Sequence, residues 1–220
     1  MNFSKPITGA ILAGGRSRRL GRDKVALPLA GRPLALWAAA ALAPCVKECW
    51  LVTNQPLAHL SLGLPLLTDL RPGQGPLGGI ETALFYTSTP LVLAVAADAP
   101  FLAPPLLAAL AEKAAKGIKT ALVCRNSSGL HPFPGIYAVK LLPRLTTFLT
   151  GEDRSVRHFL EECRAQVLTE EEVARLDPQG RSFMNLNTPE DFAAAARLAA
   201  AEAAGLSPSS SERASFSPPP

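Results

Sequence analysis

Short apolar runs alternate along the chain with longer segments rich in helix-forming residues. Most of the runs are closed by glycine, asparagine, aspartate or proline, as buried strands commonly are. The runs predict strands over residues 7–13, 48–55, 65–69, 90–100, 119–126 and 132–140. The other segments predict helices over residues 33–44, 80–87, 104–116, 141–149, 155–164 and 189–204, with a Gly/Pro-rich loop over residues 70–79.

This alternation predicts an α/β fold, because parallel strands need a crossover connection and a helix usually provides it. The expected architecture is a three-layer sandwich, with helices on both faces of a mostly parallel sheet. Residues 1–204 are expected to form a single domain, since a chain of 220 residues with 48% hydrophobic content can bury a sizeable core. Thr188 is expected to cap the last helix, with Pro189 at its first position. Residues 205–220 are rich in serine and proline and are expected to form a disordered tail.

Three polar residues and a glycine stand at or just after the carboxyl ends of four of the expected strands. Gly14, Asn54, Asp69 and Asp98 stand at the carboxyl ends of the strands that start at residues 7, 48, 65 and 90. In open parallel sheets, ligands bind in the crevice beyond these ends. The sequence therefore predicts a binding site along one edge of the sheet.

Composition narrows the class of ligand. The net charge of +4 and the isoelectric point near 9.0 are too mild for a protein that binds a nucleic-acid duplex, but they suit a small anionic ligand. No apolar stretch reaches the roughly 18 residues of a membrane span, and the first 15 residues lack a signal peptide's apolar region, so a cytoplasmic protein without a membrane partner is expected. The four cysteines form no C-x-x-C pair, which favours buried thiols over a zinc site or a disulfide framework.

A glycine- and arginine-rich stretch, "LAGGRSRRLGRDK", follows the first expected strand over residues 12–24. It does not fit the P-loop pattern, because Gly21 is not followed directly by lysine and Lys24 is not followed directly by Ser or Thr. It does not fit the dinucleotide fingerprint either, because its glycine spacing differs. The glycine pair Gly14 and Gly15 would let the backbone approach a ligand closely, and Arg19 and Lys24 could clamp several phosphate oxygens. A polyphosphate suits this arrangement, while the alternative is a solvated basic loop.

Asp98 ends the most apolar of the expected strands. A carboxylate in that position is costly to bury unless a cation compensates its charge. Mg²⁺ is the natural companion, because it prefers one or two carboxylates together with phosphate oxygens and water. The alternative is that Asp98 caps the helix that follows.

These stretches resemble a known family. "LAGGRSRRLGRDK" is similar to the L-A-G-G-x-S-x-R-M-G-x-D-K opening of the nucleotidyltransferases that act on sugars and cofactors, with Leu20 in place of methionine. "RPGQGPLGGI" from Arg71, "DAPF" from Asp98 and "FMNLNTPEDF" from Phe183 narrow the resemblance to the molybdenum cofactor guanylyltransferases. The similarity runs from about residue 7 to residue 192, in the same order and without a large gap.

The resemblance implies a Rossmann-like α/β domain, Mg²⁺ as cofactor, and transfer of GMP from GTP to the terminal phosphate of molybdenum-molybdopterin, with release of pyrophosphate. A molybdoenzyme or a cofactor-insertion protein is a further partner that it allows. It implies backbone contacts to the nucleotide, phosphate contacts, recognition of guanine and ribose, and a metal ligand. By position, these roles fall on Leu12, Ala13 and Gly14 (backbone), Lys24 (phosphates), Asn54 and Asp69 (guanine and ribose), Gly75 (base) and Asp98 (Mg²⁺).

Residues on the acceptor side are predicted from several weaker patterns. His131 belongs to a His-Pro pair that family members often carry there, although Pro134 adds a second rigid residue nearby. The alternative is that His131 is a structural residue of a loop. Arg154 and Arg157 could hold an anionic pterin phosphate or form a solvated helix face.

Two asparagines of the "FMNLN" stretch are also candidates for the acceptor side. Asn185 and Asn187 would share one face of an extended segment, so both amides could contact one ligand. The alternative is an Asx turn before the Thr188 cap.

Two rival functions remain open from the sequence. The first is another transferase of the same superfamily, a cytidylyltransferase acting on the same pterin or a sugar-phosphate enzyme. The second is a nucleotide-binding domain without catalysis, which would have no need to retain Lys24, Asp69 and Asp98 together.

Overall fold

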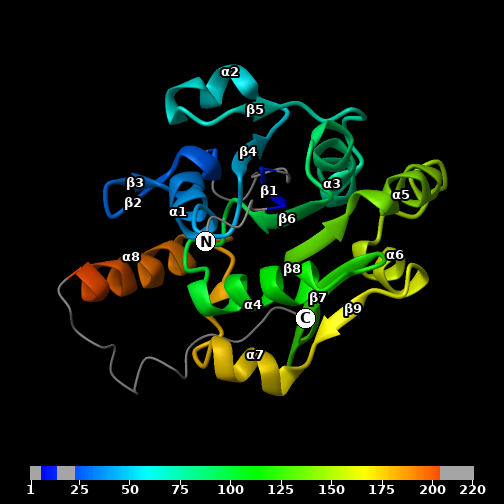
Figure 1. Cartoon of the computed structure of the whole chain (residues 1–220). Helices are drawn as coiled ribbons and strands as arrows, with labels where there is room; N and C mark the ends of the chain where they lie inside the picture. The colour runs from blue at the N-terminus through cyan, green and yellow to red at the C-terminus, as the bar shows by residue number, and fades with distance from the viewer. Residues whose placement is uncertain (1–5, 14–22, 204–220) are drawn as a thin grey trace.

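The computed structural model describes residues 6–13 and 23–203, and these residues build a twisted seven-stranded sheet (Figure 1). The strand order is β5-β4-β1-β6-β8-β7-β9. The strands are β1 (Ile7–Leu12), β4 (Glu48–Val52), β5 (Leu66–Leu67), β6 (Leu91–Ala96), β7 (Ala121–Asn126), β8 (Gly129–Ala138) and β9 (Gln166–Leu168). All neighbouring pairs are parallel except the two that β8 makes with β6 and β7. The expected mostly parallel sheet is confirmed.

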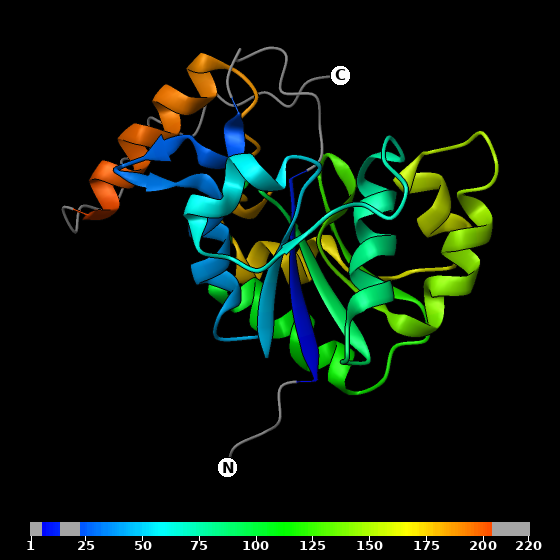
Figure 2. The same ribbon diagram turned by 90° about the horizontal axis from the view of Figure 1, so that it is seen from above.

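Helices cover both faces of the sheet, as Figure 2 shows from above. One hydrophobic cluster joins the sheet to α1 (Leu34–Leu42), α4 (Pro104–Ala115) and α7 (Glu170–Leu176). A second cluster joins the opposite face to α3 (Gly75–Tyr86), α5 (Leu142–Phe148) and α6 (Val156–Glu162). The short segments are α2 (Pro56–His59) and the 3-10 turns η1 (Lys24–Ala26), η2 (Leu60–Leu62), η3 (Val139–Leu141) and η4 (Arg181–Phe183). The three-layer sandwich is therefore confirmed.

The central strands are apolar on both faces, which explains why their sequences read as continuous apolar runs. In β1, Ile11 belongs to the first cluster and its neighbour Leu12 to the second, because successive side chains of a strand point to opposite faces. The same alternation relates Val95 and Ala94 of β6. Both strands are thus held from two sides, and the loops at their ends start from fixed positions.

A small third cluster extends the sandwich at one side. It joins the hairpin of β2 (Pro28–Leu29) and β3 (Arg32–Pro33) to α8 (Pro189–Ala203), which lie side by side in Figure 2. Thr188 caps α8 as expected, because its hydroxyl accepts the backbone N–H of Asp191 at 3.1 Å. The cap fixes the direction in which the chain enters α8.

α3 begins at Gly75, five residues earlier than expected. Residues 75–79 belong to the helix and not to the expected loop. Gly75 has a φ of +62°, which favours glycine. A side chain at Gly79 would bring a Cβ to 3.1 Å from Leu12, so this glycine allows the helix to pack closely on the end of β1. Packing against β1 outweighs the low helix propensity of these glycines.

Three further elements differ from the expectation. β8 begins at Gly129, not at residue 132, and forms an antiparallel hairpin with β7. The sequence analysis also missed β9 and α7. A capping box marks the start of α7, since Thr169 accepts the backbone N–H of Glu172 and the Glu172 carboxylate accepts that of Thr169.

Thr169→Ala is expected to lower the free energy of unfolding by about 1 kcal/mol, because one N-terminal N–H of α7 loses its acceptor. Thr169 bonds to Glu172 in the first turn of α7 and lines neither of the two cavities described below, so turnover should not change. Urea unfolding followed by circular dichroism measures the loss. Thr169→Ser, which keeps the acceptor, is the control, and an equal loss in both variants would contradict the capping role.

Cys124 and Cys163 are buried free thiols as expected, whereas Cys45 and Cys49 are free thiols that are only partly buried. Burial raises the pKa of the Cys124 thiol to about 12 and also raises that of Cys163.

Within residues 6–13 and 23–203, no helix has both the length and the apolar character needed to cross a membrane.

Candidate active site

The predicted strand-end residues gather at one edge of the sheet. Asn54, Asp69 and Asp98 each follow the last residue of β4, β5 or β6 by two positions. β1, β4, β5 and β6 are parallel, so their carboxyl ends lie at the same edge. The residues expected to read the base and to hold the metal are thus presented together.

Three distant segments meet at Asp98. The Lys24 ammonium lies 3.5 Å from Oδ2 of Asp98 and donates a 2.8 Å hydrogen bond to Oδ1 of Asn187. The backbone N–H of Leu186 donates to the carbonyl of Asp98 at 3.0 Å, which holds the residue 185–187 segment beside the end of β6. Lysine, aspartate and asparagine therefore form one cluster, called here the Lys24 cluster.

The environment of Asp98 favours a cation. Its side chain is 26% exposed and that of Lys24 is 13% exposed. Burial raises the pKa of Asp98 above its usual value, although the charge of Lys24 acts in the opposite direction. A second cation would relieve this cost, so the carboxylate fits a divalent metal ion. The described residues contain no group of three or more His, Cys, Asp or Glu placed to hold a metal, so further ligands would be phosphate oxygens and water.

A second pair lies at the ends of β4 and β5. The side-chain amide of Asn54 donates to Oδ2 of Asp69 at 2.7 Å. Partial burial raises the pKa of Asp69, and the amide of Asn54 acts in the opposite direction. The loop over residues 70–74 follows Asp69 and leads to Gly75, the first residue of α3. Next to it, Oε1 of Gln74 is buried without a hydrogen-bond partner among the described residues, and the sequence analysis assigned Gln74 no role.

The backbone at the end of β1 is partly committed to the sheet. The N–H of Ala13 donates to Val52 at 2.9 Å, and the carbonyl of Leu12 accepts from Ala97 at 3.1 Å. These two groups are therefore engaged, which limits the backbone contacts predicted for Leu12 and Ala13. Gly14, Gly15 and Arg19, with the other arginines of the basic loop, lie outside the described residues, as does the tail over residues 205–220.

Two of the predicted acceptor-side residues share a cavity. His131 on β8 and Asn185 line a pocket of about 90 Å³ together with Phe183. The ring of His131 lies 4.5 Å from that of Phe183. Burial, and then the charge of Arg157, lower the pKa of His131.

The remaining acceptor candidates lie elsewhere. Asn187 contacts Lys24 and does not form the Asx turn considered as its alternative. Arg154 precedes α6, so it does not lie on a helix face, and its guanidinium donates to the backbone carbonyls of Gly151 and Asp153. Arg154 does not line the cavity of His131.

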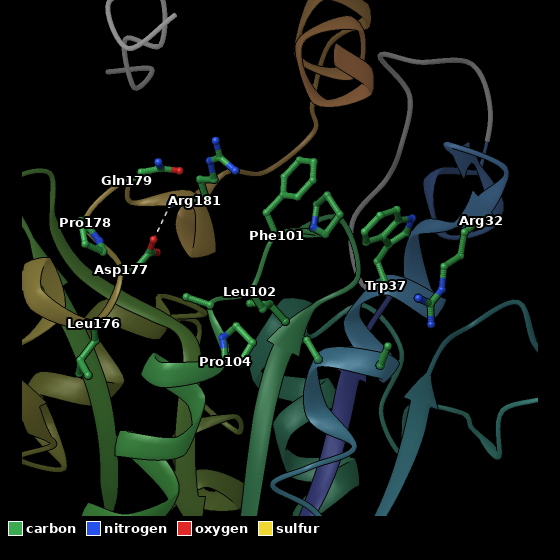
Figure 3. Close-up of a pocket in the computed structure, with 14 residues that line it drawn as sticks. Arg32, Trp37, Phe101, Leu102, Pro104, Leu176, Asp177, Pro178, Gln179 and Arg181 are labelled. Atoms are coloured by element: carbon green, nitrogen blue, oxygen red, sulfur yellow. Dashed lines mark hydrogen bonds between the residues drawn. The ribbon is translucent and has the colours of Figure 1, made fainter. Parts of the chain in front are cut away.

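A larger open cavity of about 470 Å³ lies between α1, the start of α4 and the turn after α7 (Figure 3). Trp37 and Phe101 form an edge-to-face pair in it, and the guanidinium of Arg32 lies 5.6 Å from the Trp37 ring. Asp177 accepts the backbone N–H of Arg181 at 3.1 Å. The cavity contains none of the Lys24 cluster, so it is separate from the candidate site.

Comparison with known proteins agrees with this geometry. The family model described as "MobA-like NTP transferase domain" matches residues 9–170. The chain is 36% identical to a probable molybdenum cofactor guanylyltransferase of Chloroflexus aggregans, over 84% of this chain and 91% of the relative. It is 35% identical to a molybdenum cofactor guanylyltransferase of Cereibacter sphaeroides, over 86% of this chain and 95% of the relative.

A solved structure gives the same relationship. The crystal structure of molybdopterin-guanine dinucleotide biosynthesis protein A from Archaeoglobus fulgidus superposes with a TM-score of 0.77 and 26% identity, and the match covers 88% of this chain and 98% of that one. The family match spans β1 to the start of α7 and includes Lys24, Asn54, Asp69 and Asp98. The protein therefore belongs to the MobA-like NTP transferase family of nucleotidyltransferases.

Proposed function

We propose that the protein transfers GMP from GTP to the terminal phosphate of molybdenum-molybdopterin, forming molybdopterin guanine dinucleotide and pyrophosphate. The Lys24 cluster carries the proposal, because it brings a cation and a metal-binding carboxylate together at the sheet edge where ligands bind. The names of relatives at 35% and 36% identity support the choice of donor and acceptor.

The reaction needs little covalent chemistry from the protein. An oxygen of the acceptor phosphate attacks the α-phosphorus of GTP, and pyrophosphate leaves in line. The acceptor phosphate is already ionised near neutral pH, so no general base is needed. The chain's own task is to position the two substrates and to neutralise charge on the leaving pyrophosphate. Lys24, which contacts Asp98 and Asn187, is proposed to perform this task with the assistance of Arg19.

A divalent metal ion is general among nucleotidyltransferases. We propose Mg²⁺ here, with Asp98 as its protein ligand. When bound, the ion supplies positive charge to the phosphate oxygens. Asp98 contributes the carboxylate, and Lys24 keeps it oriented at the edge of the sheet.

Selection of guanine is proposed to rest on residues beyond β4 and β5. Asn54 and Asp69, already paired with each other, would face the ribose and base. Gln74 supports the same choice, because its buried Oε1 lacks a donor and guanine presents two neighbouring N–H donors, N1 and N2, on its Watson–Crick edge, where cytosine and adenine each present one amino group. Leaving such an acceptor unpaired is costly, so a base that supplies the donor is preferred.

The acceptor is proposed to lie on the β8 side of Asp98. His131 and Asn185 line one cavity there, and Asn187 contacts Lys24 from the same short segment. The acceptor phosphate would thus approach between the two asparagines.

GTP is expected to be used at least 20-fold more efficiently than CTP or ATP, on the scale by which buried polar groups discriminate between ligands. Pyrophosphate release is measured with Mg²⁺, molybdenum-molybdopterin and each nucleotide in turn. Gln74→Leu is expected to narrow the ratio of GTP to CTP, since the unpaired acceptor is removed. Equal rates with CTP would instead favour the cytidylyltransferase alternative, and binding without pyrophosphate release would favour the non-catalytic one.

A further inference from the structure

A hydrogen-bonded series of three side chains, Thr53, His59 and Asp23, ends at the residue before Lys24 and has no part in the proposed chemistry. The His59 side chain is only 2% exposed. Its Nδ1 lies 2.9 Å from the hydroxyl of Thr53, and its Nε2 contacts Oδ2 of Asp23. Sequence reasoning assigned no role to any of these three residues.

Hydrogen-bond accounting fixes the direction of this series. The carboxylate of Asp23 can only accept, so Nε2 of His59 carries a proton and donates it to Asp23. Nδ1 of the neutral ring is then an acceptor, and the hydroxyl of Thr53, which accepts the backbone N–H of Gln55 at 3.0 Å, donates to it. In this arrangement the hydroxyl, both ring nitrogens and the carboxylate all have partners.

Asp23 connects the His59 ring to the backbone next to Lys24. Its Oδ1 accepts the backbone N–H of Val25 at 3.1 Å and caps the 3-10 turn η1 that begins at Lys24. The carboxylate is thus bonded to the backbone just after Lys24 and to the His59 ring. These two bonds fix the course of the backbone from which the Lys24 side chain reaches Asp98 and Asn187.

The other end of this hydrogen-bonded series, Thr53, lies next to Asn54, which is proposed to contact the ribose and base. Thr53 follows β4 directly and precedes Asn54. Its backbone N–H donates to Leu67 of β5 at 2.8 Å, so its position is set by the sheet. One imidazole therefore links the segment that carries Lys24 to the segment that carries Asn54.

We infer that His59 is a positioning residue for the proposed nucleotidyl transfer. It holds Asp23, and through Asp23 the backbone of Lys24, at a fixed distance from the end of β4. A triphosphate that spans Lys24 and Asn54 then meets both in the geometry that transfer requires, because supporting hydrogen bonds keep the groups that contact the substrate in place. The inference rests on the proposed function.

A double-mutant cycle separates this role from a purely structural one. His59→Leu is expected to lower kcat/KM for GTP about tenfold in the otherwise unaltered protein, but less than twofold in a Lys24→Ala background, because the ring acts through Lys24. A structural role would lower kcat/KM by the same factor in both backgrounds. The assay is pyrophosphate release at saturating acceptor, run below the melting temperature of every variant.

Two further variants guard against a folding defect at the buried position. Asp23→Asn changes a side chain that is 31% exposed, and it is expected to give the same dependence on the Lys24 background. His59→Gln can still donate to Asp23, and it should keep activity within about threefold of the unaltered protein. His158→Gln, which alters a surface histidine paired with Asp153, is the matched control and should have no effect.

Each outcome has one meaning. Losses that disappear in the Lys24→Ala background, with rescue by glutamine, support the positioning role. Equal losses in both backgrounds, or no loss in either, overturn that role while the proposed function stands. No pyrophosphate release from the unaltered protein with any nucleotide overturns the proposed function, and the inference with it.

Discussion

Asp98→Asn is expected to lower kcat/KM for the proposed GMP transfer about 1000-fold, or about 4 kcal/mol. The substitution keeps the shape of the side chain and removes its charge. The carboxylate is the proposed metal ligand, and it also lies 3.5 Å from the ammonium of Lys24. The metal ion held by Asp98 would neutralise charge on the phosphates, and the contact with Asp98 orients the Lys24 ammonium, so the loss falls on turnover. Pyrophosphate release over a range of Mg²⁺ concentrations measures it.

The same variant should fold at least as stably as the parent. Burial raises the pKa of Asp98, so the folded protein binds the Asp98 proton more tightly than the unfolded chain does. This group therefore favours folding below its ordinary pKa of 3.8, and the contribution is lost as the pH rises through its raised value. Asparagine removes the buried charge, so the melting temperature at pH 7 is expected to stay equal or to rise.

The surface pair of Lys113 and Glu172, 3.1 Å apart, provides a matched control for this prediction. Glu172→Gln also exchanges a carboxylate for an amide beside a lysine, but on the outer surface of the sandwich, and it should leave turnover unchanged. Unchanged pyrophosphate release in Asp98→Asn, or an equal fall in both variants, would remove Asp98 from the metal site.

The strand ends could be predicted because they depend on short-range pattern alone. A run of apolar residues closed by Asn54, Asp69 or Asp98 reads as a buried strand, and parallel connections bring such ends to one edge. No long-range contact had to be known. For this reason the sheet, its two helical layers and the position of these three residues follow from the sequence.

The partners within the site could not be predicted in the same way. Lys24 and Asn187 are 163 positions apart, and Asp23 and His59 are 36 apart. A residue's own pattern says which face it occupies but not which distant side chain it meets. The alternation of Asn185 and Asn187 was readable, whereas the contact of Asn187 with Lys24 depends on how η4 returns to β6.

Two errors in the elements have different causes. Glycine lowers helix propensity, so the sequence favoured a loop over residues 75–79, and only the close packing of Gly79 on Leu12 explains the helix. α7 was missed although its capping box, Thr169 followed by Glu172, was present in the sequence. The first error required tertiary structure to correct, and the second did not.

Lys24→Ala is expected to lower kcat/KM for GTP about 100-fold, or about 2.7 kcal/mol, on the scale of losing one charged donor to a transition state in a site that excludes water. Only 13% of the Lys24 side chain is exposed, and it is held by Asp98 and Asn187, so no other cation among the described residues is positioned to replace it in this cluster. Steady-state kinetics with saturating acceptor and varied Mg·GTP measures the effect.

The alternative of a solvated basic loop makes a different prediction, and the surrounding cations distinguish the two. If the loop only raises the local positive potential, each substitution should weaken GTP binding slightly and in a salt-dependent way. If Lys24 and Arg19 form a triphosphate clamp, Arg19→Ala should lower kcat/KM for GTP as far as Lys24→Ala does. The other three variants of the loop should keep kcat/KM within a few-fold of the parent: Arg16→Ala, Arg18→Ala and Arg22→Ala. Lys113→Ala, from the surface pair with Glu172, supplies the baseline for losing a lysine that contacts no substrate. An equal loss of kcat/KM in all six variants would refute the clamp, because the clamp predicts a larger loss in Lys24→Ala and Arg19→Ala than in the other four.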